Sequence, residues 1–200
     1  MQHAGRLPAK VFMMDPRDCA IADELPAAAV IVDGTVDVDA MLAEIVVQQR
    51  RAGRRVRGLL MMHRGATAGC AGDMVLVDIE TRDEYLVSLP TGGGSCRADV
   101  QGFASASRVL KKAIEESPDL VVCNRFGSLE AEGKGFVAEL LDVMACGIPL
   151  LTAVAASRVD AWQRFSGGAR LLPARGDDVS AWLESTLAAS PRADAAVAAR

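Results

Sequence analysis

The sequence has few of the residues and segments that most readily indicate a function. It has 2 histidines among 200 residues, and aromatic side chains make up only 4% of the chain. Lys+Arg 22 nearly balances Asp+Glu 26, so there is no global basic field and we expect no nucleic-acid partner. No apolar run approaches the roughly 18–20 residues that cross a bilayer. The N-terminus also lacks an apolar signal core, so we expect a cytoplasmic protein without membrane insertion.

The sequence also lacks a paired-cysteine motif. Its five cysteines are odd in number, widely spaced and include no CxxC, which argues against a disulfide framework and against a zinc ribbon. Cys123 and Cys146 lie in apolar runs and are predicted to be small core residues. Cys70 and Cys96 lie in Gly-rich loops, so they stay candidates for a site.

Short apolar runs alternate with segments of helical period between residues 27 and 190, which predicts one α/β domain of three layers with a mostly parallel sheet. The first strand, helix and second strand (residues 27–62) predict a parallel pair with a right-handed crossover. Two strand-like runs between residues 74 and 89 predict an inserted β-hairpin. Residues 1–26 are predicted to be a flexible arm and residues 191–200 a frayed tail.

The stretch DLVVCNRFGSLEAEGKG, residues 119–135, is predicted to organise a site. A short buried strand opens at Asn124 and Arg125 into a polar loop, which leads into an amphipathic helix. In an open α/β sheet, ligands bind beyond the carboxyl ends of the strands, so this loop is expected to face the site. Glu130 and Glu132 lie in it, either as acid/base groups or, for Glu132, as a favourable carboxylate at the start of the helix.

Three segments carry a family resemblance. The order VRGLLMMHRG, MVLVDIETRDEYLV, DLVVCNRFGSLEAEGKGF resembles the nucleoside-triphosphatases first described in thermophiles. It looks more closely like a family of uncharacterised bacterial domains related to them, whose genes are often found beside molybdate-uptake genes. The resemblance covers roughly residues 27–162. It implies a P-loop NTPase-like fold, with a P-loop strand and helix first and an acidic motif in the register of residues 124–130.

The motifs of those enzymes are degenerate in this chain. A working P-loop needs GxxxxGK[ST], whose Lys binds the phosphates and whose hydroxyl binds Mg²⁺. The corresponding turn, DGTVDVD, has no Lys, and Asp37 and Asp39 fall in the first helical turn, where they complement the helix dipole. Asn124 and Arg125 replace the acidic pair that the resemblance implies. These departures predict that P-loop hydrolysis is lost.

A set of polar residues follows the predicted strand ends instead. Converging guanidinium groups recognise anions through charge-assisted hydrogen bonds, and Gly-rich turns add backbone amides. The leading hypothesis is therefore a non-hydrolytic accessory or regulatory protein that binds a small anion: an oxyanion such as molybdate, a phosphorylated metabolite or a nucleotide. The residues assigned to this ligand site are Asp33, Thr35, His63, Arg64, Cys70, Cys96, Arg97, Asn124, Arg125 and Arg158.

Three alternatives stay open. The arginines could instead form solvated ion pairs, each worth little, with partners such as Asp33, Asp73, Asp99 or Glu130. His63, Cys70 and Cys96 could bind a thiophilic metal if they meet in space. The protein could also be an active nucleoside triphosphatase or nucleotide-transferring enzyme with atypical motifs. The pattern assigns no cofactor and no oligomeric state.

Overall fold

A computed structural model describes residues 25–65, 73–92 and 95–189 of the chain. Predictions that fall on residues 1–24, on Cys70 and on the tail from residue 190 lie outside these residues. Within them, seven strands form one sheet in the order β4-β3-β2-β7-β8-β1-β9. The five strands from β2 to β9 run parallel, and β3 and β4 are antiparallel at one edge. The strands are β1 Ala27–Val32, β2 Val56–Arg64, β3 Asp73–Asp78, β4 Glu84–Leu86, β7 Leu120–Phe126, β8 Leu150–Ala155 and β9 Arg170–Leu172.

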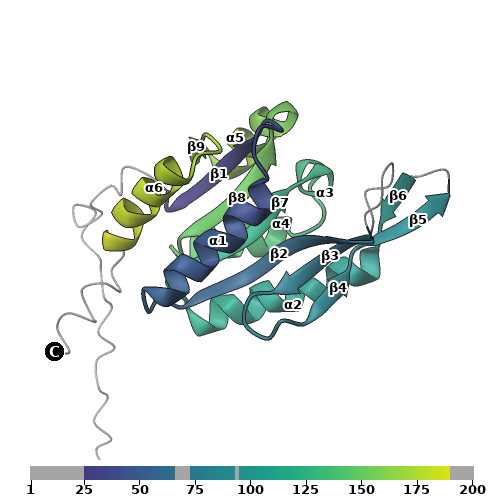
Figure 1. Cartoon of the computed structure of the whole chain (residues 1–200), viewed down its shortest axis with the longest axis horizontal. Coiled ribbons are helices and arrows are strands. Elements are labelled where there is room, and N and C mark those ends of the chain that lie inside the picture. Colours follow the sequence, from purple (N-terminus) through teal and green to yellow (C-terminus); the bar gives the residue numbers. More distant parts are fainter. Residues whose placement is uncertain (1–24, 66–72, 93–94, 190–200) are drawn as a thin grey trace, which may run out of the picture.

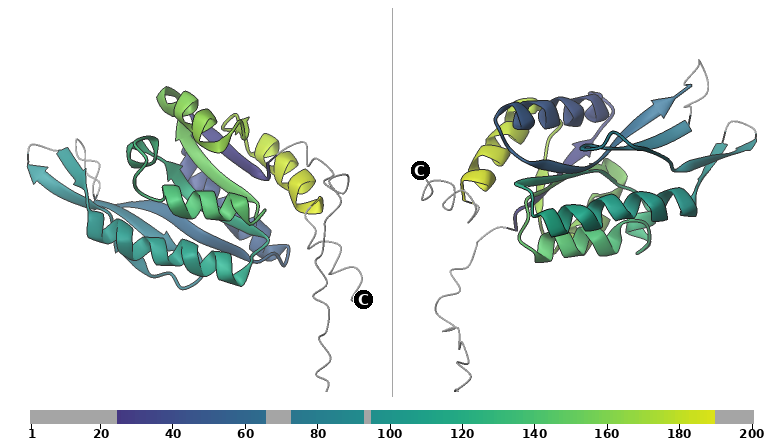
Figure 2. Two further views of the ribbon diagram at one scale, coloured as in Figure 1. Left: turned by 180° about the vertical axis from the view of Figure 1, so that it is seen from behind. Right: turned by 90° about the horizontal axis from the view of Figure 1, so that it is seen from below.

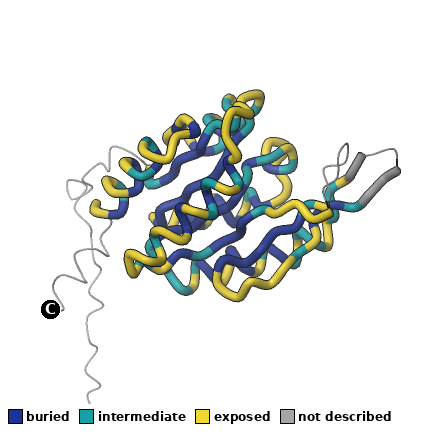
Figure 3. The backbone as a smooth tube through the Cα atoms, in the orientation of Figure 1, coloured by how far each residue is buried: buried dark blue, intermediate teal, exposed yellow. Residues whose placement is uncertain are grey.

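Helices cover both faces of the sheet and give three layers (Figures 1 and 2). Helices α1 (Val38–Arg51) and α6 (Gly176–Ala188) share one buried cluster with the strands. The opposite face carries a second cluster, to which α2 (Val100–Glu116), α4 (Val137–Ala145) and α5 (Val159–Ser166) contribute. The central strands are buried along most of their length between these layers (Figure 3). The predicted three-layer, mostly parallel α/β fold is confirmed.

The order of the strands corrects one prediction. Strands β1 and β2 run parallel but are not paired, because β8 and β7 lie between them. Burial explains this order. Residues 150–154 of β8 and 120–124 of β7 are buried, so these strands take the centre of the sheet. Strand β2 ends in three exposed residues, Met62 to Arg64, and it lies beside the antiparallel edge.

Two further details differ from the sequence-based expectation. The predicted strand at residues 85–89 is divided between β4 and β5 (Ser88–Gly92), and β5 pairs with β6 (Ser95–Ala98) in a separate two-stranded sheet. This hairpin projects beyond the end of the main sheet (Figure 1). Cys123 is buried as predicted. Cys146 is exposed, because it is the C-cap of α4 and lies beyond the last buried residue of that helix.

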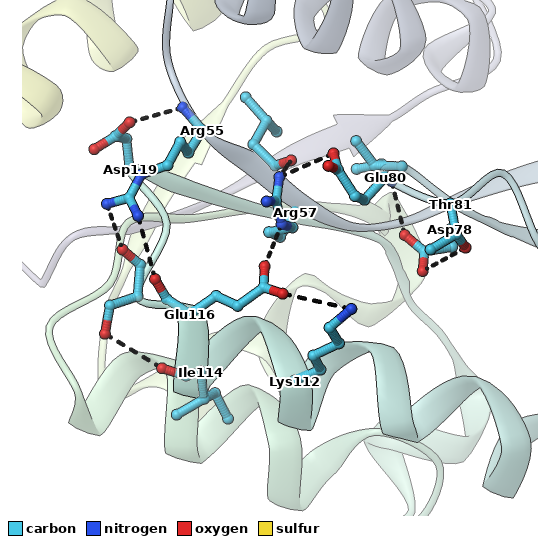
Figure 4. Close-up of polar contacts among 12 residues, drawn as sticks. Arg55, Arg57, Asp78, Glu80, Thr81, Lys112, Ile114, Glu116 and Asp119 are labelled. Carbon is cyan, nitrogen blue, oxygen red and sulfur yellow. Dashed lines mark hydrogen bonds and ion pairs between the residues drawn. The ribbon is translucent and has the colours of Figure 1, made fainter.

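Two arginines near the amino end of β2, Arg55 and Arg57, contact α2 and the turn after β3 (Figure 4). The backbone N–H of Arg55 donates to Asp119 at 2.7 Å, and its guanidinium donates to carbonyls in the last turn of α2 and at its C-cap. Arg57 lies between Glu80 and Glu116, with N–O distances of 3.0 and 2.5 Å. Cationic groups at a helix C-terminus satisfy its last carbonyls. This network therefore anchors α2 at the amino ends of the strands, and the candidate site lies at their carboxyl ends.

Among the described residues, no helix is long and apolar enough to cross a membrane.

Candidate functional site

The topological switch point of this sheet lies between the carboxyl ends of β1 and β8. These strands are neighbours, yet α1 follows β1 on one face and α5 follows β8 on the other. Adjacent strands whose following helices cover opposite faces mark the switch point, where open α/β sheets bind ligands. The loop at residues 33–37, the end of β7 and the 3₁₀ turn η1 (Ala156–Arg158) therefore surround the candidate site.

The end of β7 is shaped by an irregularity in its pairing with β8. Cys123 pairs with Thr152 and Phe126 pairs with Val154, so three steps on β7 oppose two on β8. Such a β-bulge places an extra residue in one strand and re-aims its side chains. Here consecutive residues, Asn124 and Arg125, both send their side chains to the same carboxylate on α1.

That carboxylate belongs to Asp39, in the first turn of α1. Its Oδ1 accepts from Asn124 Nδ2 at 3.1 Å, and Arg125 Nη2 lies 3.0 Å from each carboxylate oxygen. The Asp39 side chain is 17% exposed and that of Arg125 is 38% exposed. Hydrogen bonds between ionised partners are stronger than neutral ones. Asp39, Asn124 and Arg125, called the Asp39 cluster below, therefore tie α1 to β7 at the switch point.

Two polar atoms of this cluster are buried without a partner. Asn124 is 1% exposed, and its Oδ1 has no hydrogen-bond partner within the described part of the chain. The same holds for Nε of Arg125. One atom is an acceptor and the other a donor, and buried polar atoms of native proteins are normally paired with protein or bound solvent. The cluster thus has hydrogen-bonding capacity beyond its internal contacts.

The start of α1 is occupied by acidic groups of the chain itself. Asp37 caps the helix by accepting from the N–H of Ala40 at 3.0 Å. Asp33 accepts from both the hydroxyl and the N–H of Thr35, at 2.6 and 2.9 Å. The Thr35 hydroxyl bond is the main cause that lowers the pKa of Asp33. Carboxylates therefore occupy the loop before α1 and its N-cap.

Glu130 organises the loop after β7. It is 5% exposed, and its carboxylate accepts from the backbone N–H of Gly127 at 2.8 Å and of Phe136 at 3.0 Å. A Cβ on Gly135 would lie 2.0 Å from Glu130 Oε1, so that position is closed to other residues. The short helix α3 (Ser128–Ala131) is thereby fixed in place. Glu132, in contrast, is exposed and pairs with Lys134.

The remaining predicted site residues occupy different places. Arg158 is half-buried in η1 at the end of β8, close to the switch point, and forms no ion pair with any residue that the structure describes. His63 and Arg64 are exposed on the part of β2 that extends past its pairing with β7, and Arg64 forms an ion pair with Glu84 of β4. Arg97 is exposed on β6 in the projecting hairpin.

Within residues 25–65, 73–92 and 95–189, no group of three or more His, Cys, Asp or Glu side chains is arranged to hold a metal ion. Cys96 lies on β6, and Cys70 falls outside these residues.

A cavity of about 300 Å³ lies away from the switch point, between β9 and α6. Its walls include Leu172 and Trp182, and it contains none of the residues predicted to bind a ligand.

Comparison with known proteins places residues 27–182 in one family. They match the model of the family described as "Protein of unknown function (DUF2478)". Over 155 residues the chain is 36% identical to "Molybdenum import ATP-binding protein ModC 2" of Bradyrhizobium diazoefficiens. The match covers 76% of this chain and 17% of that protein. The chain therefore corresponds to a small part of that relative's length.

Proposed function

We propose, from the premise that the chain belongs to the DUF2478 family, that this protein binds a small oxyanion or a phosphorylated ligand without hydrolysing it, as an accessory or regulatory component. The observation that carries the proposal is the guanidinium of Arg125, placed by a β-bulge at the switch point of the sheet and held there by one carboxylate, Asp39. An arginine in such a position presents planar donors to an anion. The ion pair with Asp39 supports this proposal, because its carboxylate oxygens already occupy the donors that an anion would use.

Arg158 supports a second contact with the anion. It follows β8, the strand between β1 and β7, so its turn and the Asp39 cluster lie at the same edge of the sheet. A cation without an ion pair in the described residues retains its donors for a ligand. Thr35, on the loop after β1, adds a hydroxyl group near the switch point, where it donates to Asp33.

Hydrolysis is disfavoured by the charges at the start of α1. A triphosphate at this helix terminus would meet Asp33, Asp37 and Asp39, and like charges at such distances repel. The chain also has no Lys in this turn to bind the β and γ phosphates. Asp39 is itself held by hydrogen bonds from Arg125 and Asn124.

The printed name of the relative suggests which anions to test first. It describes a protein of molybdenum import that binds ATP. Molybdate and ATP are therefore the leading probes, with tungstate, sulfate and phosphate beside them. This choice assigns neither anion to the present chain.

Thermal unfolding with each anion tests the proposal. A ligand at 100 times its Kd stabilises the native state by about 2.7 kcal/mol, which raises the Tm of a chain of this size by roughly 5–10 °C. We expect at least one probe to do so, and we expect Arg125→Ala to abolish the shift. Arg51→Ala is the matched control, because Arg51 is exposed at the opposite end of α1.

Two results would overturn the proposal. One is a flat response of the wild-type protein to every probe at millimolar concentration. The other is phosphate release from ATP with Mg²⁺ at rates typical of enzymes, about 1 s⁻¹ or faster, that Arg125→Ala abolishes. That second result would instead establish the nucleoside triphosphatase.

A further inference from the structure

We infer that the ligand of the Asp39 cluster is an oxyanion that keeps a proton, namely inorganic phosphate, in preference to sulfate or molybdate. This inference rests on the proposed function and names the ligand class of the same site. It follows from the balance of donors and acceptors in the cluster.

The cluster contains acceptors as well as donors. Arg125 and the Nδ2 of Asn124 donate, whereas both Asp39 oxygens and the Oδ1 of Asn124 accept. The Oδ1 atom is buried and has no partner among the described residues. A site built only for a fully ionised anion presents donors, because each oxygen of such an anion accepts. The cluster thus has one buried donor, Arg125 Nε, and one buried acceptor, Asn124 Oδ1, without a partner among the described residues.

Sulfate and molybdate have no proton to donate at neutral pH. Against this cluster their oxygens would face the Asp39 carboxylate, and Asn124 Oδ1 would stay unpaired. Leaving a buried acceptor unpaired is unfavourable, and these anions have no O–H to place between their oxygens and the carboxylate. Both effects disfavour these anions at the same place.

Monohydrogen phosphate matches both kinds of group. Its ionised oxygens accept from the Arg125 guanidinium, and its O–H donates to an Asp39 oxygen or to Asn124 Oδ1. A hydrogen bond between O–H and a carboxylate is short and strong. Phosphate monoesters, whose second ionisation lies near pH 6, have mostly lost this proton at pH 7, so AMP is a further probe without a proton to donate.

The Arg125 side chain is the part of the Asp39 cluster that an anion from solvent would reach first. It is 38% exposed, whereas the Asp39 side chain is 17% exposed and Asn124 is 1% exposed. Arg125 is thus the most exposed of the three side chains of the cluster. An anion that draws it outward gains access to the acceptors behind it.

Isothermal titration of the wild-type protein at pH 7 with inorganic phosphate, AMP, sulfate and molybdate tests the inference. We expect phosphate to bind at least tenfold more tightly than sulfate and molybdate. The variant Asp39→Asn replaces a charged acceptor by an amide, and we expect it to reduce this discrimination at least fivefold. Urea unfolding of the variant checks that it is folded.

The outcomes separate this inference from the proposed function. Sulfate or molybdate binding as tightly as phosphate to the wild-type protein overturns the ligand class and leaves anion binding intact. Discrimination that survives in folded Asp39→Asn overturns the role of Asp39. Binding of none of the four probes overturns the proposed function, and this inference with it.

Discussion

Replacing Glu130 should unfold the loop that follows β7, and this effect is large enough to measure. The carboxylate is 5% exposed and accepts from the backbone N–H of Gly127 and of Phe136. Phe136 is itself buried and contacts Phe103 with ring centroids 5.1 Å apart. Glu130 therefore joins both ends of the loop to the core.

The size of the effect follows from those two hydrogen bonds. A hydrogen bond to a charged group contributes about 1.5–3 kcal/mol. Glu130→Ala removes both and leaves two N–H groups without their acceptor, so we expect a loss of about 3–5 kcal/mol in the free energy of unfolding. Glu130→Gln keeps one acceptor oxygen but turns an NH₂ group toward the other N–H. Its expected loss is about 1.5–3 kcal/mol.

Urea denaturation followed by circular dichroism measures these losses, with the m-value unchanged. The control is Glu132→Ala in the same loop, because the Glu132 side chain is 59% exposed and pairs with Lys134 on the surface. We expect that variant to lie within about 0.5 kcal/mol of the wild type. A loss below about 1 kcal/mol for Glu130→Ala would refute the structural role. Glu130 would then again be a candidate acid/base group, as in the prediction from the sequence.

Gly58→Ala should lower the free energy of unfolding by more than about 2 kcal/mol, because φ is +118° and an added Cβ would lie 2.0 Å from a backbone carbonyl oxygen of β7; urea denaturation with an unchanged midpoint would contradict this. The Arg57 hydrogen bond is the main cause that lowers the pKa of Glu116. A group whose pKa is lowered in the folded state stabilises the protein above the unfolded-state pKa of about 4.3, and this stability is lost as pH falls through the folded-state pKa. Arg57→Met should therefore raise the pKa of Glu116 in an NMR titration. The difference in the free energy of unfolding between wild type and Arg57→Met should also become smaller at acid pH. Burial raises the pKa of the Cys123 thiol far above its usual range, so iodoacetamide should label exposed Cys146 in the folded protein and leave Cys123 unlabelled; mass spectrometry of the peptides would contradict this by finding Cys123 labelled first.

The layers of the fold could be predicted because they depend on local patterns. Buried strands such as β8 are mostly apolar runs, and α1 is bounded by an N-cap at Asp37 and a left-handed Gly53. The position of β2 could not be predicted in the same way. The partners of β2 depend on which strands take the buried centre of the sheet. These are β7 and β8, which come much later in the chain than β2.

The candidate site was predictable only as a list of residues. Asp39 was recognisable as a first-turn acid and Arg125 as a strand-end cation, yet nothing local indicated that they meet. Their contact spans 86 positions and depends on the strand order and on the bulge. The bulge has no sequence signal here, because neither Gly nor Pro marks it. Burial of Glu130 was likewise invisible, because a carboxylate in a Gly-rich loop is ordinarily exposed.

The Asp39 cluster joins the start of a helix to the end of a strand, the two places that supply ligands to Mg²⁺ in P-loop enzymes. In P-loop enzymes Mg²⁺ is held by a hydroxyl at the start of the first helix and by an acidic residue on a strand. Here the helix supplies the carboxylate of Asp39 and the strand supplies the cation of Arg125, so the two elements are joined directly. A direct ion pair keeps α1 against β7 without any bound group. In the function proposed above, the guanidinium on β7 is the place where an external anion competes with Asp39.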